Sequence, residues 1–180
     1  SAASDVYKRQ GKGDYIRASA EKELAETISR VLYPDDSHNA GKSLRLQQQY
    51  FSTSAPLQYI VKRHKELGLD IRLLPDYAAV QINDTHPAIA IAELMRILVD
   101  IELLPWEEAF NICSRVFSYT NHTVMSEALE CWPEYLIQNL LPRIYMIIKE
   151  LNRRFCANAQ SRLNDLARVS DMAVIACLLY

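Results

Sequence analysis

The sequence has few glycines, no long apolar run and almost no net charge. Only four of its 180 residues are glycine, and apolar and polar residues never alternate for long, so helices are favoured over a large sheet. No apolar run reaches the roughly 18 to 20 residues of a membrane span, and the first ten residues lack the apolar segment of a secretory signal. The net charge of −2 offers no broad basic field for nucleic acid or an anionic membrane.

Cysteine is sparse as well. The four cysteines, Cys113, Cys131, Cys156 and Cys177, have none of the paired spacings of a disulfide framework or a zinc site. Together with the missing export signal, this favours reduced thiols and a cytoplasmic protein.

The two ends differ in character from the rest of the chain. We predict that residues 1–10 and 177–180 are non-native additions, and that residues 11–176 are the native part of one domain. Because this native part starts and stops in the middle of structural elements, we expect an internal fragment of a longer protein.

Apolar residues three and four positions apart predict helices over most of the chain. Pro34 should end the first helix, and Gly68 the second. Pro56 lies inside the second and predicts either a kink or a restart there. The last segment is either a helix pair or one helix restarted at Pro142. The expected helices cover residues 14–32, 42–67, 105–115, 125–131 and 134–160, and a further helix follows residues 83–87 and carries Leu94, Ile97, Leu98 and Ile101.

Two strand–loop–helix units are expected between these helices. Residues 78–82 and 116–119 are short apolar segments that predict buried strands, and each is followed by a polar loop and a helix. This order is typical of parallel sheets, so the predicted fold class is α/β and mostly helical. Ligands of such sheets bind beyond the carboxyl ends of the strands, where the loops carry Asp84 with His86, and Asn121 with His122.

Each of these polar residues also has a structural interpretation. Asp84 could cap the following helix, His86 could be a surface histidine, and residues 121–122 could form a turn. The acidic pair Asp35 and Asp36 could lie in a solvated loop. Asp84, His86 and His122 are also metal-ligand types, although their spacing matches no compact zinc pattern.

Two motifs resemble one known family closely. The segments QINDTHPAIAIAELMRILVD (81–100) and SYTNHTVMSEALECWP (118–133) are similar to the glycogen and maltodextrin phosphorylases. Residues 13–36, 44–51 and 140–155 resemble the same family in the same order, so the resemblance covers essentially all of residues 11–176. Together the NDTHP and YTNHT motifs are highly specific.

The resemblance implies a fold and a chemistry. The chain would be part of the N-terminal lobe of a two-lobed, glycosyltransferase-B-like enzyme. That enzyme would use inorganic phosphate to cleave the terminal α-1,4 bond of a glucan and release glucose 1-phosphate. Its cofactor would be pyridoxal 5′-phosphate, held by a lysine outside this fragment. The resemblance therefore implies that residues 1–180 alone neither bind the cofactor stably nor turn over glucan.

The resemblance also assigns roles to individual residues. His122 matches the catalytic-site histidine near the glucose 6-hydroxyl, and Asp84 and His86 match residues that line the glucose pocket. Asp36 matches the acidic residue of a mobile gate loop, and residues 14–32 match a helix at a homodimer contact. We expect His122→Ala to weaken catalysis strongly with little loss of folding.

The sequence departs from the family pattern in a few places. Ser37 stands where many members have asparagine, which leaves contacts from that position open, while Ser126 and Cys131 replace a proline and an arginine. A shorter segment before the first predicted strand indicates a bacterial-type member. The basic pair Lys62 and Arg63 is best interpreted as a solvated helix face, so nucleotide regulation is not expected.

Two other function classes stay open at this point. A hydrolase could use paired carboxylates such as Asp36 and Asp84, if their separation allowed it. A helical interaction or glucan-binding module would need no catalytic residues. Release of glucose 1-phosphate in the presence of phosphate would separate phosphorolysis from hydrolysis, which releases free glucose.

Overall fold

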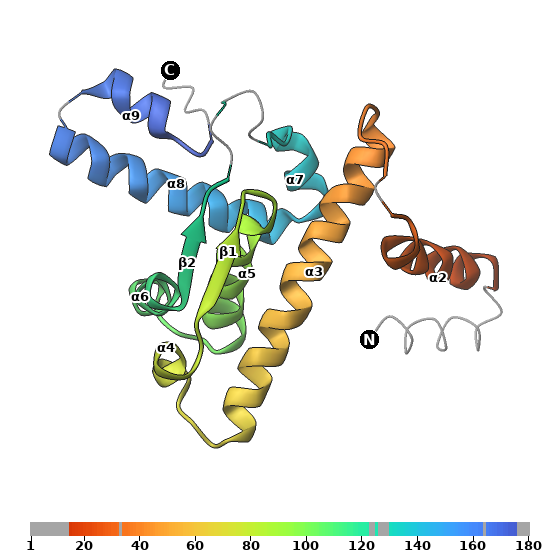
Figure 1. The fold of residues 1–180 in the computed structure, drawn as a ribbon, viewed down its shortest axis with the longest axis horizontal. Helices are drawn as coiled ribbons and strands as arrows, with labels where there is room; N and C mark the ends of the chain where they lie inside the picture. The colour runs from red at the N-terminus through yellow and green to blue at the C-terminus, as the bar shows by residue number, and fades with distance from the viewer. Residues whose placement is uncertain (1–14, 33, 123–124, 126–129, 164, 176–180) are drawn as a thin grey trace. The chain divides into compact units, whose positions relative to one another are not determined.

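The computed structural model describes residues 15–32, 34–122, 125, 130–163 and 165–175. The chain divides into two compact units, residues 1–48 and residues 49–180. Helix α3 (Asn39–Glu66) crosses the division, and each unit is described by itself (Figure 1).

The first unit contains α2 (Tyr15–Arg30) and the first turns of α3. The prediction of a helix here is confirmed, and α2 ends four residues before Pro34. The side-chain amide of Gln48 donates hydrogen bonds to the carbonyl oxygens of Ile28 and Val31, at 3.1 and 2.7 Å. These bonds satisfy carbonyls that a helix end leaves without a partner.

The loop between α2 and α3 is held against the first turn of α3. Its Asp35 carboxylate accepts a hydrogen bond from the Ser37 amide at 2.9 Å, and this bond is the first cause of the lowered pKa of Asp35. A Cβ atom on Gly41 would lie 1.6 Å from the Asp35 carbonyl oxygen. Only glycine therefore allows the loop to approach α3 this closely.

In the second unit, α3 continues through Pro56 as one helix, so of the two alternatives the restart is wrong. Leu57 and Val61 are buried on the apolar face around Pro56, and this packing outweighs the one backbone hydrogen bond that proline removes. The predicted stop at Gly68 is confirmed: its φ is +72°, and its amide donates to the Lys65 carbonyl at 2.9 Å.

A two-stranded parallel sheet lies at the centre of the second unit. Strand β1 (Val80–Asn83) pairs with β2 (Phe117–Thr120), with Val80 opposite Phe117 and Asn83 opposite Thr120. This confirms the predicted parallel α/β arrangement. Strand β1 begins two residues later than predicted because the Ala78 amide instead caps α4 (Leu74–Tyr77), donating to the Leu74 carbonyl.

Helices connect the two strands. After β1 the chain forms a short 3₁₀ turn, η2, then α5 and a π-helical turn, η3, before α6 leads directly into β2 (Figure 1). The helices predicted from apolar periodicity over this region are confirmed. The bounds are His86–Ala88 for η2, Ile89–Arg96 for α5, Ile97–Ile101 for η3 and Trp106–Val116 for α6.

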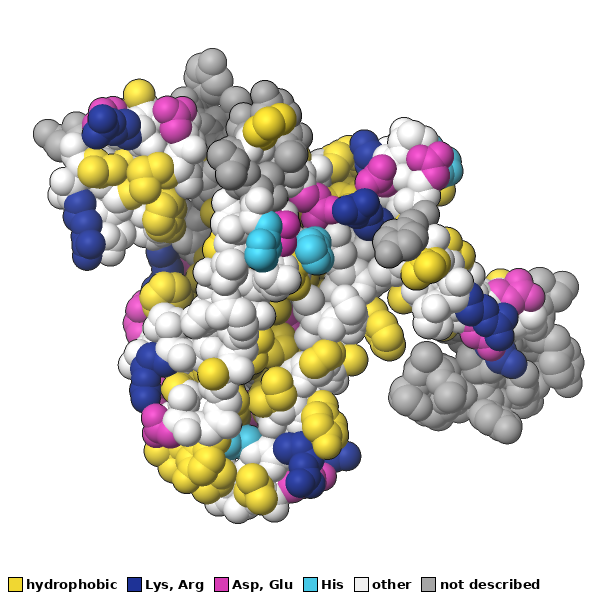
Figure 2. All heavy atoms as spheres, in the orientation of Figure 1, with side chains coloured by type: hydrophobic (Ala, Val, Ile, Leu, Met, Phe, Trp, Pro, Cys, Tyr) yellow, Lys and Arg dark blue, Asp and Glu magenta, His cyan; other side chains and the backbone are white. Residues whose placement is uncertain are grey.

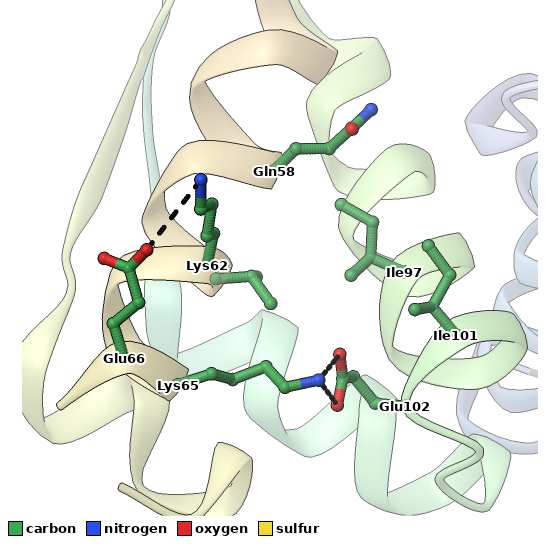
Figure 3. A pocket seen from close by; sticks show the side chains of 8 residues that line it. Gln58, Lys62, Lys65, Glu66, Ile97, Ile101 and Glu102 are labelled. Carbon is green, nitrogen blue, oxygen red and sulfur yellow. Dashed lines mark hydrogen bonds and ion pairs between the residues drawn. The ribbon is translucent and has the colours of Figure 1, made fainter. Parts of the chain in front are cut away.

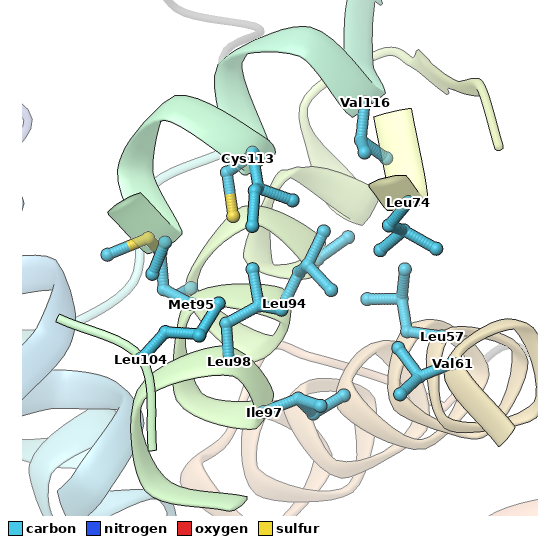
Figure 4. Close-up of a cluster of buried hydrophobic side chains, with 14 of the residues drawn as sticks. Leu57, Val61, Leu74, Leu94, Met95, Ile97, Leu98, Leu104, Cys113 and Val116 are labelled. Atoms are coloured by element: carbon cyan, nitrogen blue, oxygen red, sulfur yellow. The ribbon is translucent and has the colours of Figure 1, made fainter. Parts of the chain in front are cut away.

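Apolar side chains from these elements form one buried cluster beneath the sheet. Figure 4 shows side chains of α3, α4, α5, η3 and α6 meeting in this cluster. Burial of so much apolar surface is the main stabilising contribution to the unit. Its fully buried members include Leu74, Leu94, Met95, Ile97, Leu98, Ala109, Cys113, Val116 and Ile147.

One carboxylate lies inside this region, fully buried. Glu93 accepts hydrogen bonds from the Tyr50 hydroxyl at 2.9 Å, the Ser54 hydroxyl at 2.7 Å and the Arg96 guanidinium at 2.7 Å. Burial alone would raise the pKa of Glu93, but the three hydrogen bonds outweigh it and lower the pKa. The Glu93 network ties α3 to α5, and α5 follows the loop after β1.

The last part of the second unit is helical. The predicted break at Pro142 is confirmed: α7 ends at Leu140, and α8 begins at Pro142, which fits both a helix pair and a restart at that proline. The predicted helix 125–131 lies mostly outside the described residues, and Cys131, which is described, is not helical. The remaining bounds are Ile71–Leu73 for η1, Glu134–Leu140 for α7, Pro142–Leu163 for α8 and Leu166–Met172 for α9.

Candidate functional site

Two loops meet at the carboxyl ends of β1 and β2. We call residues 84–86 and 121–122 the strand-end loops. The register pairs Asn83 with Thr120, and the Asp84 amide donates to the Thr120 carbonyl at 2.9 Å, which continues the pairing one residue further. Figure 2 shows two histidine side chains beside a carboxylate over this end of the strands. The parallel strands thus bring together the two motifs that the sequence singled out.

Asp84 adopts an unusual backbone conformation at the start of the first loop. Its φ is +74°, in the left-handed region that side chains other than Gly, Asn and Asp rarely occupy. Its carboxylate accepts the amide of Thr85 at 2.7 Å. The N-cap residue of η2 is Thr85 and that of α5 is Ala88, so Asp84 is the N-cap of neither helix. Backbone strain of this kind is often found at functional sites.

His86 and His122 are both exposed. His86 is the first residue of η2, and Pro87 is the second. The Nε2 atom of His122 contacts the side-chain oxygen Oδ1 of Asn83 across the two strands. Both imidazoles are therefore available at the surface, and that of His122 is held by a partner on the neighbouring strand.

The sequence reasoning missed Asn83. Asn83 begins the NDTHP motif, but its position in the sequence gives no sign of the partner that its side chain contacts. Two residues earlier, Gln81 makes a similar contact, because its side-chain amide donates to the Thr120 hydroxyl at 2.7 Å. Alternate residues of a strand share one face, so Asn83 and Gln81 lie on the same face of β1, where Gln81 contacts Thr120 and only Asn83 contacts His122.

Asp36 belongs to the first compact unit, whereas Asp84, His86 and His122 belong to the second. Its carboxylate is exposed and pairs with the Arg45 guanidinium at 3.0 Å. Asp36 thus lies in a solvent-exposed loop, as its structural interpretation predicted. The proximity of Asp36 to the strand-end loops remains a prediction.

The described residues do not fit a metal site or the attachment of pyridoxal phosphate. No three histidine, cysteine, aspartate or glutamate side chains gather among them closely enough to hold a metal ion. A Schiff-base lysine is commonly activated by desolvation, but Lys22, Lys62, Lys65 and Lys149 are exposed and Lys42 is only half-buried. We therefore derive no chemical step through this cofactor from these residues.

An open groove of about 460 Å³ lies between the end of α3 and η3 (Figure 3). Its charged side chains are paired with one another: Lys65 with Glu102 at 2.8 Å, and Lys62 with Glu66 at 3.8 Å. None of the strand-end loop residues lines this groove. Its hollow shape alone does not make it a binding site, because its cations are already neutralised.

The strand-end loops offer the chemistry that a sugar requires. Hydroxyl groups need directional donors and acceptors, and here two exposed imidazoles and a carboxylate project from adjacent strand ends. No helix among the described residues has the length and apolar character needed to cross a bilayer. Within the described part of the chain, the strand-end loops are the best-supported candidate site.

Comparison with known proteins finds one family across nearly the whole chain. The family profile described as carbohydrate phosphorylase matches residues 2–177. The chain is 53% identical over 172 residues to the liver form of glycogen phosphorylase from Ovis aries, and 46% identical to the muscle form from Homo sapiens. It is 49% identical over 156 residues to glycogen phosphorylase from Bacillus subtilis (strain 168).

These alignments cover 91% of this chain for the two animal proteins and 86% for the bacterial one, but only 20% of each relative. The chain thus spans about a fifth of the length of these relatives. The identities to animal and bacterial proteins are similar, so the expected bacterial type remains a prediction. On the extent of the match, the chain belongs to the carbohydrate phosphorylase family.

Proposed function

We propose that the full-length protein containing this chain is an α-1,4-glucan phosphorylase, and that the strand-end loops form one wall of its glucose site. The observation that carries this proposal is the parallel pairing of β1 and β2, which brings His122 against Asn83, the residue before Asp84. The names of the relatives support the reaction, glucan with phosphate giving glucose 1-phosphate.

Each candidate residue has a role in this proposal. His122 is the catalytic residue, whose imidazole contacts the sugar being transferred. Asp84 and His86 supply further hydrogen-bonding groups along the pocket, and Asp36 reaches the cleft from its own loop. In a reaction that moves a whole sugar, such groups act mainly by orienting the ring and by stabilising developing charge.

Other parts of the full-length enzyme supply the rest of the active site. We place this chain in the N-terminal lobe of a two-lobed, glycosyltransferase-B-like fold, and the pyridoxal phosphate lysine and phosphate-binding residues outside it. We also propose a cytoplasmic location for the full-length enzyme.

We further propose a homodimer contact through residues 14–32. Ala20 of α2 and Val31, which follows its last residue, are exposed, and Ile28 of α2 is half-buried. Accessible apolar residues on one segment are suited to contact with a partner subunit.

The proposal is tested by the products of the full-length protein. Maltooligosaccharide is incubated with and without inorganic phosphate, and glucose 1-phosphate and free glucose are measured separately. Phosphate-dependent glucose 1-phosphate is expected. Release of free glucose independent of phosphate would favour a hydrolase using Asp36 and Asp84, and no product of either kind would favour a glucan-binding module.

A second arm of this experiment uses residues 1–180 alone. Because the described lysines do not fit Schiff-base formation, we expect this chain neither to retain pyridoxal phosphate nor to produce glucose 1-phosphate. Turnover by the purified 180-residue chain would contradict our division of labour between this chain and the rest of the enzyme.

A further inference from the structure

We propose that Asn83 is a positioning residue that fixes the tautomer and ring orientation of His122. This inference rests on the proposed glucan phosphorylase function and deepens it. Its basis is the contact between Oδ1 of Asn83 and Nε2 of His122, which joins the last residue of β1 to the loop after β2. Asn83 itself does not touch the substrate in this proposal.

The backbone of β1 gives Asn83 a fixed place. Asn83 is paired with Thr120 in the ladder, and its neighbour Ile82 is buried on the opposite face of the strand with 2% of its surface exposed. A strand that is anchored by a buried side chain cannot rotate without exposing it. The amide group of Asn83 is therefore presented to β2 from a rigid base, although the side chain is exposed.

The chemistry of the pair selects one form of the imidazole. A neutral histidine carries one N–H donor and one acceptor nitrogen. A carbonyl oxygen can only accept, so the Asn83 contact places the proton on Nε2 and leaves the lone pair on Nδ1. The ring then presents an acceptor to a ligand hydroxyl. Without Asn83 the ring could also take the other tautomer and rotate, and part of the population would present the wrong atom.

A second histidine of this chain is also held by a carbonyl oxygen at its Nε2 atom. The Nε2 atom of His64 lies 2.7 Å from the backbone carbonyl oxygen of Asp70, which fixes that ring in the interior. At the strand ends the corresponding oxygen is Oδ1 of the Asn83 side chain instead of a backbone carbonyl. Because this oxygen comes from a side chain, it can be removed by mutation without altering the backbone.

The test compares two substitutions in the full-length enzyme. Asn83→Leu has a similar size but no acceptor, whereas Asn83→Asp keeps an acceptor oxygen at Oδ1. We expect Asn83→Leu to lower kcat/KM for phosphorolysis about tenfold, the usual effect of one hydrogen bond, and Asn83→Asp to recover most of this loss. Gln81→Ala is the matched control, because it removes the neighbouring cross-strand contact and leaves His122 untouched; it should stay within about twofold of wild type.

A double-mutant cycle shows whether Asn83 acts through His122. Once His122 is alanine, Asn83→Leu should cause no further loss. An equal loss in both backgrounds would reveal a merely structural role and overturn the inference, as would equal impairment by the Asp and Leu variants. Unfolding midpoints of all variants are compared, and Asn83→Ala replaces Asn83→Leu if the latter lowers the midpoint. If the wild-type enzyme made no glucose 1-phosphate, the proposed function itself would fail, and this inference with it.

Discussion

His64 and His122 use the same kind of contact in two very different regions. His64 has only 4% of its surface exposed, its Nε2 lies 2.7 Å from the Asp70 carbonyl oxygen, and its ring meets Tyr77 edge-on at 5.6 Å. His122 is exposed, and its Nε2 contacts the side chain of Asn83. The difference teaches that neither residue type nor a hydrogen-bonded Nε2 identifies a functional histidine; the exposure of the ring separates the two.

The carboxylates Glu93 and Asp84 show the same contrast. Glu93 is fully buried and surrounded by Tyr50, Ser54 and Arg96. Asp84 is half-buried in a strained backbone conformation at the edge of the sheet. We therefore expect changes in the buried region to lower stability, and changes at the strand-end loops to lower activity.

The largest stability effect should come from Glu93→Ala. Removing one partner of a buried ion pair leaves Arg96 without its carboxylate, which typically costs about 3–5 kcal/mol of unfolding free energy. Thermal unfolding of the full-length protein measures this effect. The control is Glu108→Ala, which removes an exposed ion pair with Arg72 and should change the midpoint little. Similar midpoints for both variants would contradict the importance of burial.

His64→Ala should come next. The substitution removes a packed ring and one of the two hydrogen bonds to the Asp70 carbonyl, the other being donated by the Leu73 amide, so we expect a loss of about 2–3 kcal/mol. His122→Ala should change stability by less than about 0.5 kcal/mol, as exposed sites usually do. Denaturant titration of the two variants measures both effects. Equal shifts of the two midpoints would contradict the claim that the buried histidine contributes more to stability than the exposed one.

Acid should weaken the buried region through Glu93. Its pKa is lowered in the folded state from the ordinary value of 4.5, so the unfolded chain binds the proton more readily. The resulting stability is fully present above about pH 4.5 and is lost as the pH falls through the folded pKa. Unfolding midpoints measured between about pH 3 and pH 6 should fall less steeply in Glu93→Gln than in wild type. Parallel curves would show that another group carries the acid sensitivity.

The smallest effect separates the backbone of Asp84 from its carboxylate. Asp84→Gly and Asp84→Ala both remove the carboxylate, but only alanine resists a φ of +74°. We expect the alanine variant to be less stable than the glycine variant by about 1 kcal/mol, with activity lowered in both. Calorimetry compares the pair, and a more stable alanine variant would mean that the loop relaxes out of this conformation.

Much of this fold could be predicted from local patterns in the sequence. Apolar periodicity located the helices at residues 14–32 and 105–115, and the two short apolar segments located the parallel strands. The parallel order in turn predicted that the polar residues after the strands would meet at one edge of the sheet. These predictions succeeded because each depends on residues close together in the chain.

Features that depend on distant residues could not be predicted. The continuity of α3 through Pro56 results from packing around Leu57 and Val61. The contact between Asn83 and His122 depends on the strand register, which cannot be read from the sequence alone. Glu93 lies on the apolar helix 89–96, and its burial follows from partners on α3 that are about 40 residues earlier.

The most direct test of the account measures phosphorolysis by the full-length enzyme with His122 or His64 replaced by alanine. The account predicts that His122→Ala lowers kcat/KM by about a hundredfold or more while the unfolding midpoint is kept. His64→Ala should lower the midpoint and leave kcat/KM near wild type at temperatures where the protein remains folded. Unchanged turnover in His122→Ala would remove the strand-end loops from the glucose site.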